Sequence, residues 1–324
     1  MEAAVKTEGL IRRFRGGVVA VAGVDLEVPE GQIYGFLGPN GAGKSTMVRM
    51  LTTLLRPSAG VASVAGHDLV HDAGAVRRSI GVALQDASID PFMTGRELLR
   101  LQATLHGIPR RDGRARAEAL LDRVGLVDAA DRRVGTYSGG MRRRLDLAMA
   151  LVHRPIVLFL DEPTTGLDPV SRLTLWDEVR RLNDEGTTVF LTTQYLEEAD
   201  QLADRVGIID GGRIVAEGTP KALKAEVGDP SLTITVGSSA DRQAAFDALA
   251  RFGPSVPTRE GCIAVRLPEG AAAVADVVRA LDTASVEPQE IDLAMPTLDD
   301  VFVAKTGRRL EGEGAEAPIT VAES

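Results

Sequence analysis

A glycine-rich turn at residues 38–45 constrains what this chain can fold into more than any other segment. It follows residues 33–37, an apolar run typical of a buried strand, and precedes residues 47–55, whose apolar positions recur at helical spacing. The turn has the pattern G-x-x-x-x-G-K-[ST]. Its place between a strand and a helix disfavours the alternative of an ordinary turn with a stray lysine. We therefore expect a loop of backbone N–H groups that leads into a helix N-terminus.

This loop predicts a site for a nucleoside triphosphate with Mg²⁺. Successive N–H groups converge on one point, and the positive end of the helix dipole adds to their attraction for phosphate. The ammonium group of Lys44 suits the β- and γ-phosphates, and the hydroxyl of Ser45 suits Mg²⁺. The residues expected to contact the nucleotide here are Gly38, Pro39, Asn40, Gly41, Ala42, Gly43, Lys44, Ser45 and Thr46.

The composition is that of a globular protein with room for two domains: 324 residues, 44 % hydrophobic and 26 % charged. No apolar run reaches the ~20 residues of a membrane span, and residues 1–7 lack the apolar core of a signal peptide, so we expect a cytoplasmic location. The net charge of −9 argues against a broad nucleic-acid footprint. The single cysteine, Cys262, cannot form an internal disulfide and is expected in the core.

Alternating apolar and polar residues between Val5 and Val28 predict an antiparallel strand pair ahead of the loop. Phe14 falls near the turn that joins the two strands. Its ring could stack on an adenine base held beside the phosphate loop, since aromatic faces pack on any base. The alternative is an aromatic residue that covers the sheet edge.

Residues 80–85 form another apolar run, which ends in the amide of Gln85, a group that can hold a metal-bound water. Residues 94–132 are expected to be helical, with Thr94 as N-cap and Glu97 three residues later, and residues 111–124 are expected to form a second amphipathic segment. We interpret residues 90–140 as an insertion between strands of the nucleotide-binding core. Its arginine-rich faces are most simply solvated surface, and binding of a partner is the alternative.

Two later motifs also indicate phosphate chemistry. The Ser138-Gly139-Gly140 turn stands immediately ahead of a helical pattern, which predicts a second anion site of N–H groups and a hydroxyl. The apolar run 156–160 ends in Asp161 and Glu162, at the strand end where an open α/β sheet binds its ligands. Asp161 suits the surroundings of Mg²⁺, and Glu162 can polarise a water. The alternative is a pair of acids that caps the strand end.

The strand expected at residues 187–193 again ends in an amide, Gln194, and a Gly-Gly turn within residues 206–215 predicts a hairpin that closes the first domain. We expect a domain boundary near residues 220–230. Beyond it, strands and helices predict a small α/β unit, for which a ferredoxin-like arrangement is one candidate. This unit contains no catalytic constellation, so we prefer a structural or docking role over a drug-sensing pocket. Residues 311–324 are expected to be disordered.

Taken in order, the motifs resemble the ATP-binding subunit of ABC transporters. They are the loop 38–45, Gln85, Ser138-Gly139-Gly140, Asp161-Glu162 and Gly166-Leu167-Asp168. The resemblance implies an α/β fold: a P-loop ABC ATPase core over residues 5–222, with an antiparallel β subdomain and a helical insertion, and a small C-terminal α/β domain over residues 228–308. It implies ATP and Mg²⁺ as ligands. It also implies a head-to-tail pair of copies, in which each ATP lies between the loop of one copy and Ser138 of the other.

The same resemblance implies roles for single residues. Glu162 would be the general base for the attacking water, with Lys44 and Gln194 as further catalytic residues. Phe14 would stack on the adenine. The residues implied to serve the metal are Ser45, Gln85 and Asp161.

Two positions depart from the family pattern. Met141 stands where the signature usually has glutamine, and Gln194 stands where the switch histidine is usual. An amide can donate to a γ-phosphate but cannot carry a proton charge, so we expect hydrolysis that is slower or less sensitive to pH.

Three segments, 137–146, 191–201 and 298–307, look like the daunorubicin/doxorubicin-resistance branch of that family. This likeness implies the ATPase subunit of a drug exporter, held at the cytoplasmic side of the cell membrane by an integral membrane permease, with no nucleic acid as partner. One alternative is the ATPase subunit of a polysaccharide or lipid exporter. Another is a soluble ABC ATPase that acts on nucleic acid or ribosomes.

Overall fold

The computed structural model describes residues 3–84, 89–237, 239–256 and 262–308 and divides at Pro220 into two compact units, which are described separately below. Gln85 and residues 311–324 lie outside the described residues. In the described ranges, no helix combines the length and the hydrophobicity that crossing a bilayer requires.

The first unit is built on a six-stranded sheet in the order β10-β9-β3-β8-β7-β6. Five strands are parallel, and the hairpin partner β10 runs antiparallel at the edge. The Gly211-Gly212 turn of that hairpin is confirmed. The strands are β3 (Ile33–Leu37), β6 (Ile80–Ala83), β7 (Val157–Asp161), β8 (Thr188–Thr193), β9 (Arg205–Asp210) and β10 (Arg213–Gly218).

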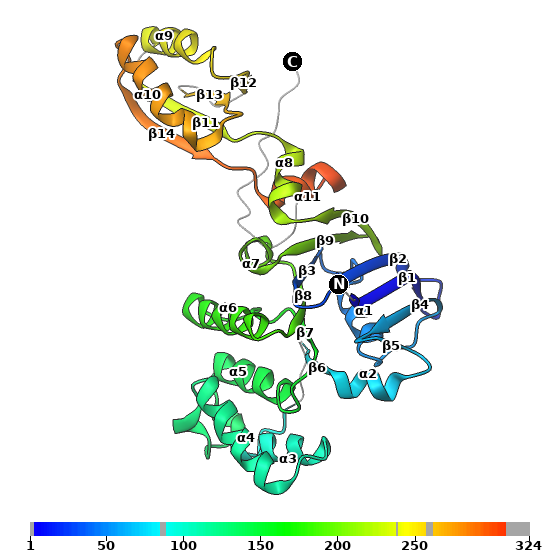
Figure 1. Ribbon diagram of the computed structural model, residues 1–324. Helices are drawn as coiled ribbons and strands as arrows, with labels where there is room; N and C mark the ends of the chain where they lie inside the picture. The colour runs from blue at the N-terminus through cyan, green and yellow to red at the C-terminus, as the bar shows by residue number, and fades with distance from the viewer. Residues whose placement is uncertain (1–2, 85–88, 238, 257–261, 309–324) are drawn as a thin grey trace. The chain divides into compact units, whose positions relative to one another are not determined.

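Both faces of this sheet are buried, which explains why its strands are continuous apolar runs. In β7, Val157 and Phe159 join one hydrophobic cluster while Leu158 and Leu160 join the other. Figure 1 shows α1 (Lys44–Leu51) on one side of the sheet and α5 (Gly139–Ala150), α6 (Pro169–Asp184) and α7 (Leu196–Leu202) on the other. The carboxyl ends of the strands are thus left free for a ligand.

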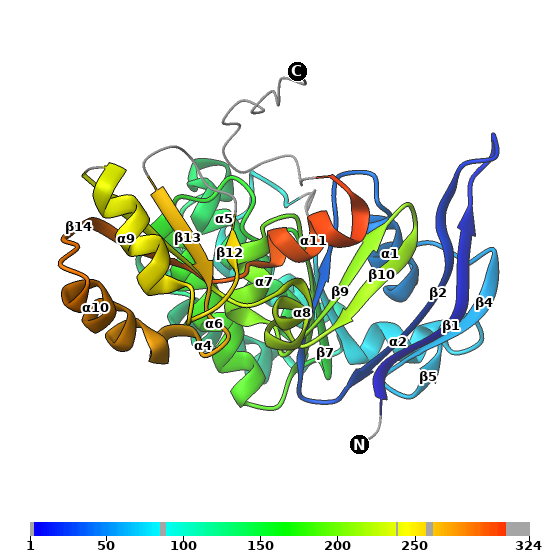
Figure 2. The same ribbon diagram turned by 90° about the horizontal axis from the view of Figure 1, so that it is seen from above.

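An antiparallel sheet in the order β2-β1-β4-β5 covers the α1 side (Figures 1 and 2). The pairing of β1 (Ala3–Arg13) with β2 (Val19–Pro29) confirms the predicted strand pair. The remaining elements here are β4 (Ala59–Val64), β5 (His67–Asp68) and α2 (Ala73–Ser79).

The insertion contains α3 (Gly95–Leu105), α4 (Arg110–Arg123) and the start of α5. Thr94 and Glu97 form the predicted capping box: each side chain bonds to the backbone N–H of the other residue. The helical pattern is interrupted at Gly107 and Gly125, whose φ angles of 71° and 63° end α3 and α4. Two short 3₁₀ turns, at Val127–Ala129 and Val134–Thr136, lead into α5.

The second unit has the ferredoxin-like strand order. Its sheet, β12-β13-β11-β14, is antiparallel throughout and follows the chain order β-α-β-β-α-β. Cys262 is buried on β13, as predicted. Helix α9 ends at Leu249, after which the chain turns through residues 250–253 toward β12. The elements are β11 (Ser231–Val236), α9 (Ser239–Leu249), β12 (Ser255–Val256), β13 (Cys262–Arg266), a 3₁₀ turn at Gly270–Ala273, α10 (Val274–Thr283) and β14 (Pro288–Ala294).

Two helices that the strand and helix pattern did not predict bound this unit, α8 (Pro220–Val227) and α11 (Leu298–Thr306). Thr297 and Asp300 form a capping box at the start of α11. Nζ of Lys305 in α11 lies 2.7 Å from a carboxylate oxygen of Glu226 in α8. The first and last helices of the unit therefore lie side by side.

Candidate nucleotide site

The phosphate loop leaves β3 and passes too close to neighbouring strands for side chains. A Cβ atom on Gly38 would lie 2.3 Å from the backbone oxygen of Ile209, and one on Gly43 would lie 2.3 Å from that of Ala20. Gly43 also has a φ of 113°, which other residues rarely adopt. The glycines therefore let the loop pack against β2 and β9 and present N–H groups at the start of α1.

Lys44 is buried inside this loop, with 4 % of its surface exposed. Its Nζ donates to the carbonyl of Gly38 at 2.6 Å and lies 3.4 Å from Oε1 of Glu162. Burial lowers the pKa of the Lys44 ammonium, while the carboxylates of Glu162 and Asp161 oppose that shift. The cation is thus held between the loop and the end of β7.

Ser45 and Asp161 face each other across the same edge. The Ser45 hydroxyl donates to Oδ1 of Asp161 at 3.3 Å, and the Thr192 hydroxyl of β8 donates to the same oxygen. Asp161 is 3 % exposed and pairs in register with Thr192. A hydroxyl and a carboxylate at this separation are hard oxygen ligands suited to Mg²⁺, so these residues fit the predicted metal.

Glu162 is the first residue beyond β7 and has the left-handed φ of 48°. Its N–H donates to the backbone oxygen of Thr192 at 3.0 Å, which holds the turn against β8. Its carboxylate lies near Nζ of Lys44 and accepts a bond of 3.4 Å from the hydroxyl of Thr165. Strained backbone at a strand end often marks a functional residue, because it aims one side chain.

Arg143 lies on α5, the helix that follows the Ser138-Gly139-Gly140 turn (the signature turn), and joins it to the carboxyl end of β7. The sequence interpretation missed this residue. Its guanidinium donates to the carbonyls of Leu84, Asp161 and Pro163 at 2.8–2.9 Å. It also pairs with Asp146 at 3.3 Å, and 13 % of its side chain is exposed. The only sequence signal was one arginine within an arginine run. Arg143 differs from its neighbours Arg142 and Arg144 in that its guanidinium reaches three backbone carbonyls at this edge.

A buried contact lies behind Gln194. The Trp176 Nε1–H donates to Oε1 of Glu198 at 3.0 Å, and burial raises the pKa of this glutamate. The N–H of Tyr195 donates to the Thr193 hydroxyl at 2.9 Å, which fixes the turn on either side of Gln194. Sequence reasoning did not find Glu198 or Trp176, since their meeting depends on how α6 packs on α7.

The signature turn lies elsewhere on the unit. Ser138 caps α5 by accepting the N–H of Met141 at 3.2 Å, as its position predicted, and it is exposed. A Cβ atom on Gly140 would lie 2.9 Å from Oγ of Ser171 in α6, so the turn packs closely on α6. Over the described residues, no hydrogen bond or ion pair joins residues 138–140 to the loop 38–46.

The remaining predicted residues are spread around the edge. Gln194 follows β8 and is half-buried. Phe14 lies at the β1–β2 turn, 39 % exposed, with the Arg12 guanidinium 4.8 Å above its ring. Gln85 lies outside the described residues. The structure therefore brings Lys44, Ser45, Asp161 and Glu162 together, and it does not bring the signature turn to them.

Comparison with known proteins agrees with this geometry. A family profile described as "ABC transporter" matches residues 21–165. The chain is 48 % identical over 306 residues to the daunorubicin resistance ATP-binding protein DrrA3 of Streptomyces coeruleorubidus, covering 94 % of this chain and 96 % of the relative. It is 47 % identical over 319 residues to the daunorubicin/doxorubicin resistance ATP-binding protein DrrA of Streptomyces peucetius, covering 97 % and 95 %.

A second group of relatives matches a shorter stretch. The Nod factor export ATP-binding protein I of Burkholderia orbicola is 44 % identical over 214 residues, covering 66 % of this chain and 70 % of the relative. Among solved structures, an ATP-binding cassette described as a dimeric post-hydrolysis state with ADP and Pi superposes with a TM-score of 0.60. That match has 26 % identity and covers 66 % of this chain and 98 % of the other. The chain belongs to the family of ABC transporter ATP-binding subunits, and its likeness to the daunorubicin/doxorubicin resistance branch extends over nearly its whole length.

Proposed function

We propose that this chain hydrolyses Mg²⁺-bound ATP to power an exporter of hydrophobic drugs, as a peripheral subunit on the cytoplasmic side of the cell membrane. The observation that carries the proposal is the meeting of Lys44, Ser45, Asp161 and Glu162 at the carboxyl ends of β3 and β7. This set supplies a cation for phosphates, two oxygen ligands and a base within one buried edge.

Each residue has a distinct part in the proposed reaction. The loop N–H groups and Lys44 bind the β- and γ-phosphates. Ser45 and Asp161, with Gln85, would hold Mg²⁺, which neutralises charge on the phosphates when bound. Glu162 accepts the proton of the attacking water, and its left-handed backbone aims the carboxylate toward Lys44. Gln194 orients the γ-phosphate by donating its amide N–H, and Phe14 stacks on the adenine.

A second copy of the chain completes the site. Ser138 and the two glycines form an anion site that points to solvent rather than to the loop of the same chain. A second copy turned head to tail would bring this turn to the γ-phosphate. The likeness to a cassette described as dimeric supports such a pair.

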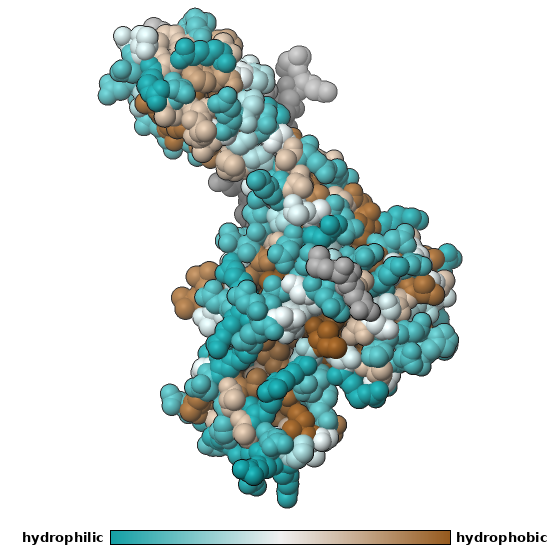
Figure 3. Space-filling view, in the orientation of Figure 1, coloured by the Kyte–Doolittle hydropathy of each residue, from teal (hydrophilic) through white to brown (hydrophobic). Residues whose placement is uncertain are grey.

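The surface between the insertion and the core suits a permease. A groove of about 430 Å³ is lined from both sides by Leu54, Leu84, His106 and Met149, among others. Phe92 and Leu105 are exposed nearby on the insertion, and Figure 3 shows hydrophobic surface interrupting the hydrophilic residues over these helices at the lower end of the view. Because Arg143 bonds to the carbonyls of both Leu84 and Asp161, a partner seated here is linked to the catalytic edge.

Drugs are favoured over other cargo because the drug-resistance relatives match a larger share of the chain. The drug-resistance relatives match 94–97 % of the chain, which includes the second unit, whereas the Nod factor relative matches 66 %. Export of a polysaccharide or a lipid is therefore the second candidate.

The test is transport into inside-out membrane vesicles that contain this chain and its membrane partner. We expect ATP-dependent uptake of daunorubicin, lost in Lys44→Ala. Leu105→Glu is expected to release the chain from the membrane, because it places a charge on the surface proposed to meet the permease. Val61→Glu is the matched control: it changes another exposed apolar residue, on β4 and away from that surface, and is expected to leave the chain bound. Uptake that persists in Lys44→Ala would contradict the ATPase role. Full ATPase activity without drug uptake, but with transport of a polysaccharide or a lipid, would support the second candidate.

A further inference from the structure

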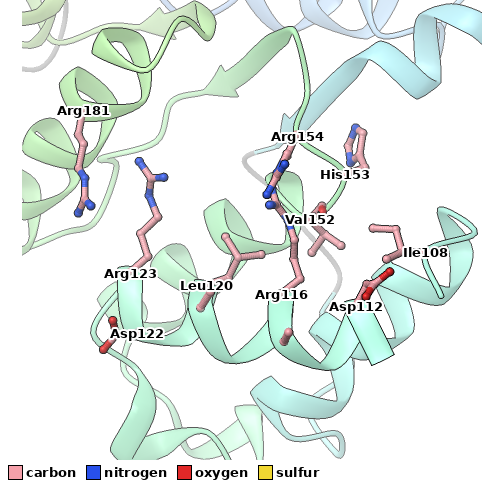
Figure 4. Close-up of a pocket in the computed structure, with 12 residues that line it drawn as sticks. Ile108, Asp112, Arg116, Leu120, Asp122, Arg123, Val152, His153, Arg154 and Arg181 are labelled. Carbon is pink, nitrogen blue, oxygen red and sulfur yellow. Dashed lines mark hydrogen bonds between the residues drawn. The ribbon is translucent and has the colours of Figure 1, made fainter. Parts of the chain in front are cut away.

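A basic groove lies on the first unit, away from the nucleotide site. It has a volume of about 790 Å³ and runs between α4, the loop that follows α5, and α6 (Figure 4). None of the residues given a part in ATP binding or hydrolysis lines it. A volume of this size is in the range of small-molecule sites.

Four arginines from three elements line this groove. Arg116 and Arg123 come from α4, Arg154 from the loop after α5, and Arg181 from α6. In Figure 4 the side chains of Arg116 and Arg154 lie side by side, and those of Arg123 and Arg181 extend into the same space further along α4. Asp112 and Asp122 lie toward the two ends. The groove thus gathers guanidinium groups that are far apart in sequence.

Only half of this positive charge is matched by carboxylates. Arg123 pairs with Glu178 and, at 2.7 Å, with Glu185. Arg181 lies 3.5 Å from the same Glu185. These two arginines and two glutamates therefore neutralise one another.

Arg116 and Arg154 differ from that pair. Arg116 donates to the carbonyls of Leu151 and Val152 at 3.0 and 2.8 Å, which anchors its guanidinium at the carboxyl end of α5 without a carboxylate. In the ranges that the structure describes, neither arginine forms an ion pair with an acidic side chain. Burial, and then the charges of Arg154 and Arg123, lower the pKa of Arg116. The guanidinium of Arg116 is thus held in place, and the charge of Arg154 lies close enough to lower its pKa.

Arg154 is held in an uncommon backbone conformation. Its φ is 57°, in the left-handed region that residues with a Cβ rarely adopt, and its N–H donates to the carbonyl of Leu151. The turn directs this exposed arginine toward Arg116 at the groove (Figure 4).

We propose that Arg116 and Arg154 bind the phosphate group of a phosphorylated small molecule at a site separate from the ATP site. A phosphate dianion matches two guanidinium groups in charge; Arg154 can offer a bidentate fork, and Arg116, whose Nε and Nη2 donate to the two carbonyls, can offer Nη1. Ile108, Ala115 and Ala119 line the groove beside them, which gives the ligand's apolar part a place to lie. The shared chemistry is a phosphate ester with an apolar portion, and its source is either a soluble metabolite or a lipid headgroup.

The test measures binding to the full-length chain that carries Lys44→Ala, so that the phosphate loop contributes little. The probes are inorganic pyrophosphate, by titration calorimetry, and vesicles of phosphatidylcholine with and without phosphatidic acid, whose headgroup is a phosphate monoester, by co-sedimentation. In this background, Arg154→Gln is expected to weaken binding at least about ten-fold, because it removes a charge-assisted contact. Arg154→Lys keeps the charge but loses the guanidinium fork, so its affinity is expected to lie between that of the parent and that of Arg154→Gln. Arg111→Gln, an exposed change on the same helix outside the groove, is expected to bind as its parent does.

Each outcome decides the proposal. Pyrophosphate binding that depends on Arg154 supports a soluble ligand, and vesicle binding that depends on Arg154 and phosphatidic acid supports a lipid headgroup. Equal losses in Arg154→Gln and Arg111→Gln would mean a general charge effect and would overturn it, as would binding of neither probe. Arg116→Lys is a second variant for the same binding measurements. Because Arg116 also anchors the carboxyl end of α5, its unfolding curve is recorded to show that the variant is folded. Because ATP turnover is not measured, failure here leaves the proposed function standing.

Discussion

The phosphate loop and the signature turn are two glycine-rich turns at helix N-termini, and the structure treats them differently. At the loop, Lys44 and Ser45 reach Asp161 and Glu162, and the cation is almost completely buried. At the signature turn, Ser138 caps its own helix and otherwise faces solvent. Two turns with similar local chemistry thus differ in their tertiary partners. The loop meets its partner residues within the chain, whereas we propose that the signature turn meets a second copy.

The largest expected effect is at the phosphate loop and the residues that it meets. Glu162→Gln keeps the size and the bond from Thr165 but removes the base, so we expect turnover to fall about 10³-fold while ATP binding persists. The variant is also expected to accumulate as an ATP-bound dimer. Phosphate release and size-exclusion chromatography with ATP measure the two effects. Normal turnover in this variant would remove Glu162 from the role of base.

The next largest effect is expected at the signature turn. Ser138→Asp keeps an N-cap but places a negative charge where the proposed dimer holds the γ-phosphate, so turnover is expected to drop about 100-fold. Thermal unfolding of the isolated chain is expected to be unchanged, because the cap remains. Ser138→Thr is the control with a hydroxyl. A dimer that still forms with ATP in Ser138→Asp would show that the two copies meet elsewhere.

A third prediction concerns the link between the two regions. Arg143→Met removes the donor for the carbonyls of Leu84, Asp161 and Pro163, which we expect to cost about 3 kcal/mol of unfolding free energy. Denaturant unfolding measures this loss. The control is Arg142→Met, which changes an exposed neighbour on the same helix and is expected to shift stability by less than about 0.5 kcal/mol. Equal effects in the two variants would contradict the linking role.

The smallest effect is a pH dependence at the groove between insertion and core. The rings of His106 and His153 stack at 3.8 Å between centroids, and Nε2 of His153 lies 2.8 Å from the carbonyl of Ile80. Burial lowers the pKa of both histidines, so the unfolded chain binds more protons. Their contribution to stability is therefore complete above about pH 6.5 and declines as pH falls below that value toward their folded pKa.

Asp146 lines the same groove and acts in the opposite sense. Burial raises its pKa to about 6, against the pull of Arg143, so its cost to stability grows as pH rises from about 4 to 6. Melting temperatures at pH 5.5 and 7.5 separate the two contributions when His106→Gln/His153→Gln is compared with the parent. The double variant is expected to lose less on acidification. Parallel curves would contradict the histidine contribution.

The same contrast explains what the sequence could and could not predict. The loop, the strand pair and the capping box at Thr94 depend on neighbouring residues, and the local pattern was sufficient for each. Asp161 and Glu162 were placed correctly because parallel strands deliver their ends to one edge. Arg143, Thr192 and Glu198 were missed, since their partners lie in other elements and no spacing reveals which long side chains reach them.

Helix ends and short helices followed the same rule. The second amphipathic segment predicted at residues 111–124 is close to α4, whereas the helix ends at Gly107 and Gly125 were not predicted, because they depend on the left-handed backbone of these two glycines. The strand order of the second unit was one candidate among small α/β arrangements, and strand pairing decided it.

The ion pair between Lys305 and Glu226 places the two ends of the second unit next to each other. A segment whose entry and exit are neighbours can be exchanged or removed as a cassette, since a few linker residues would bridge the gap. Transplanting residues 221–308 onto a related ATPase would show which transporter traits travel with them.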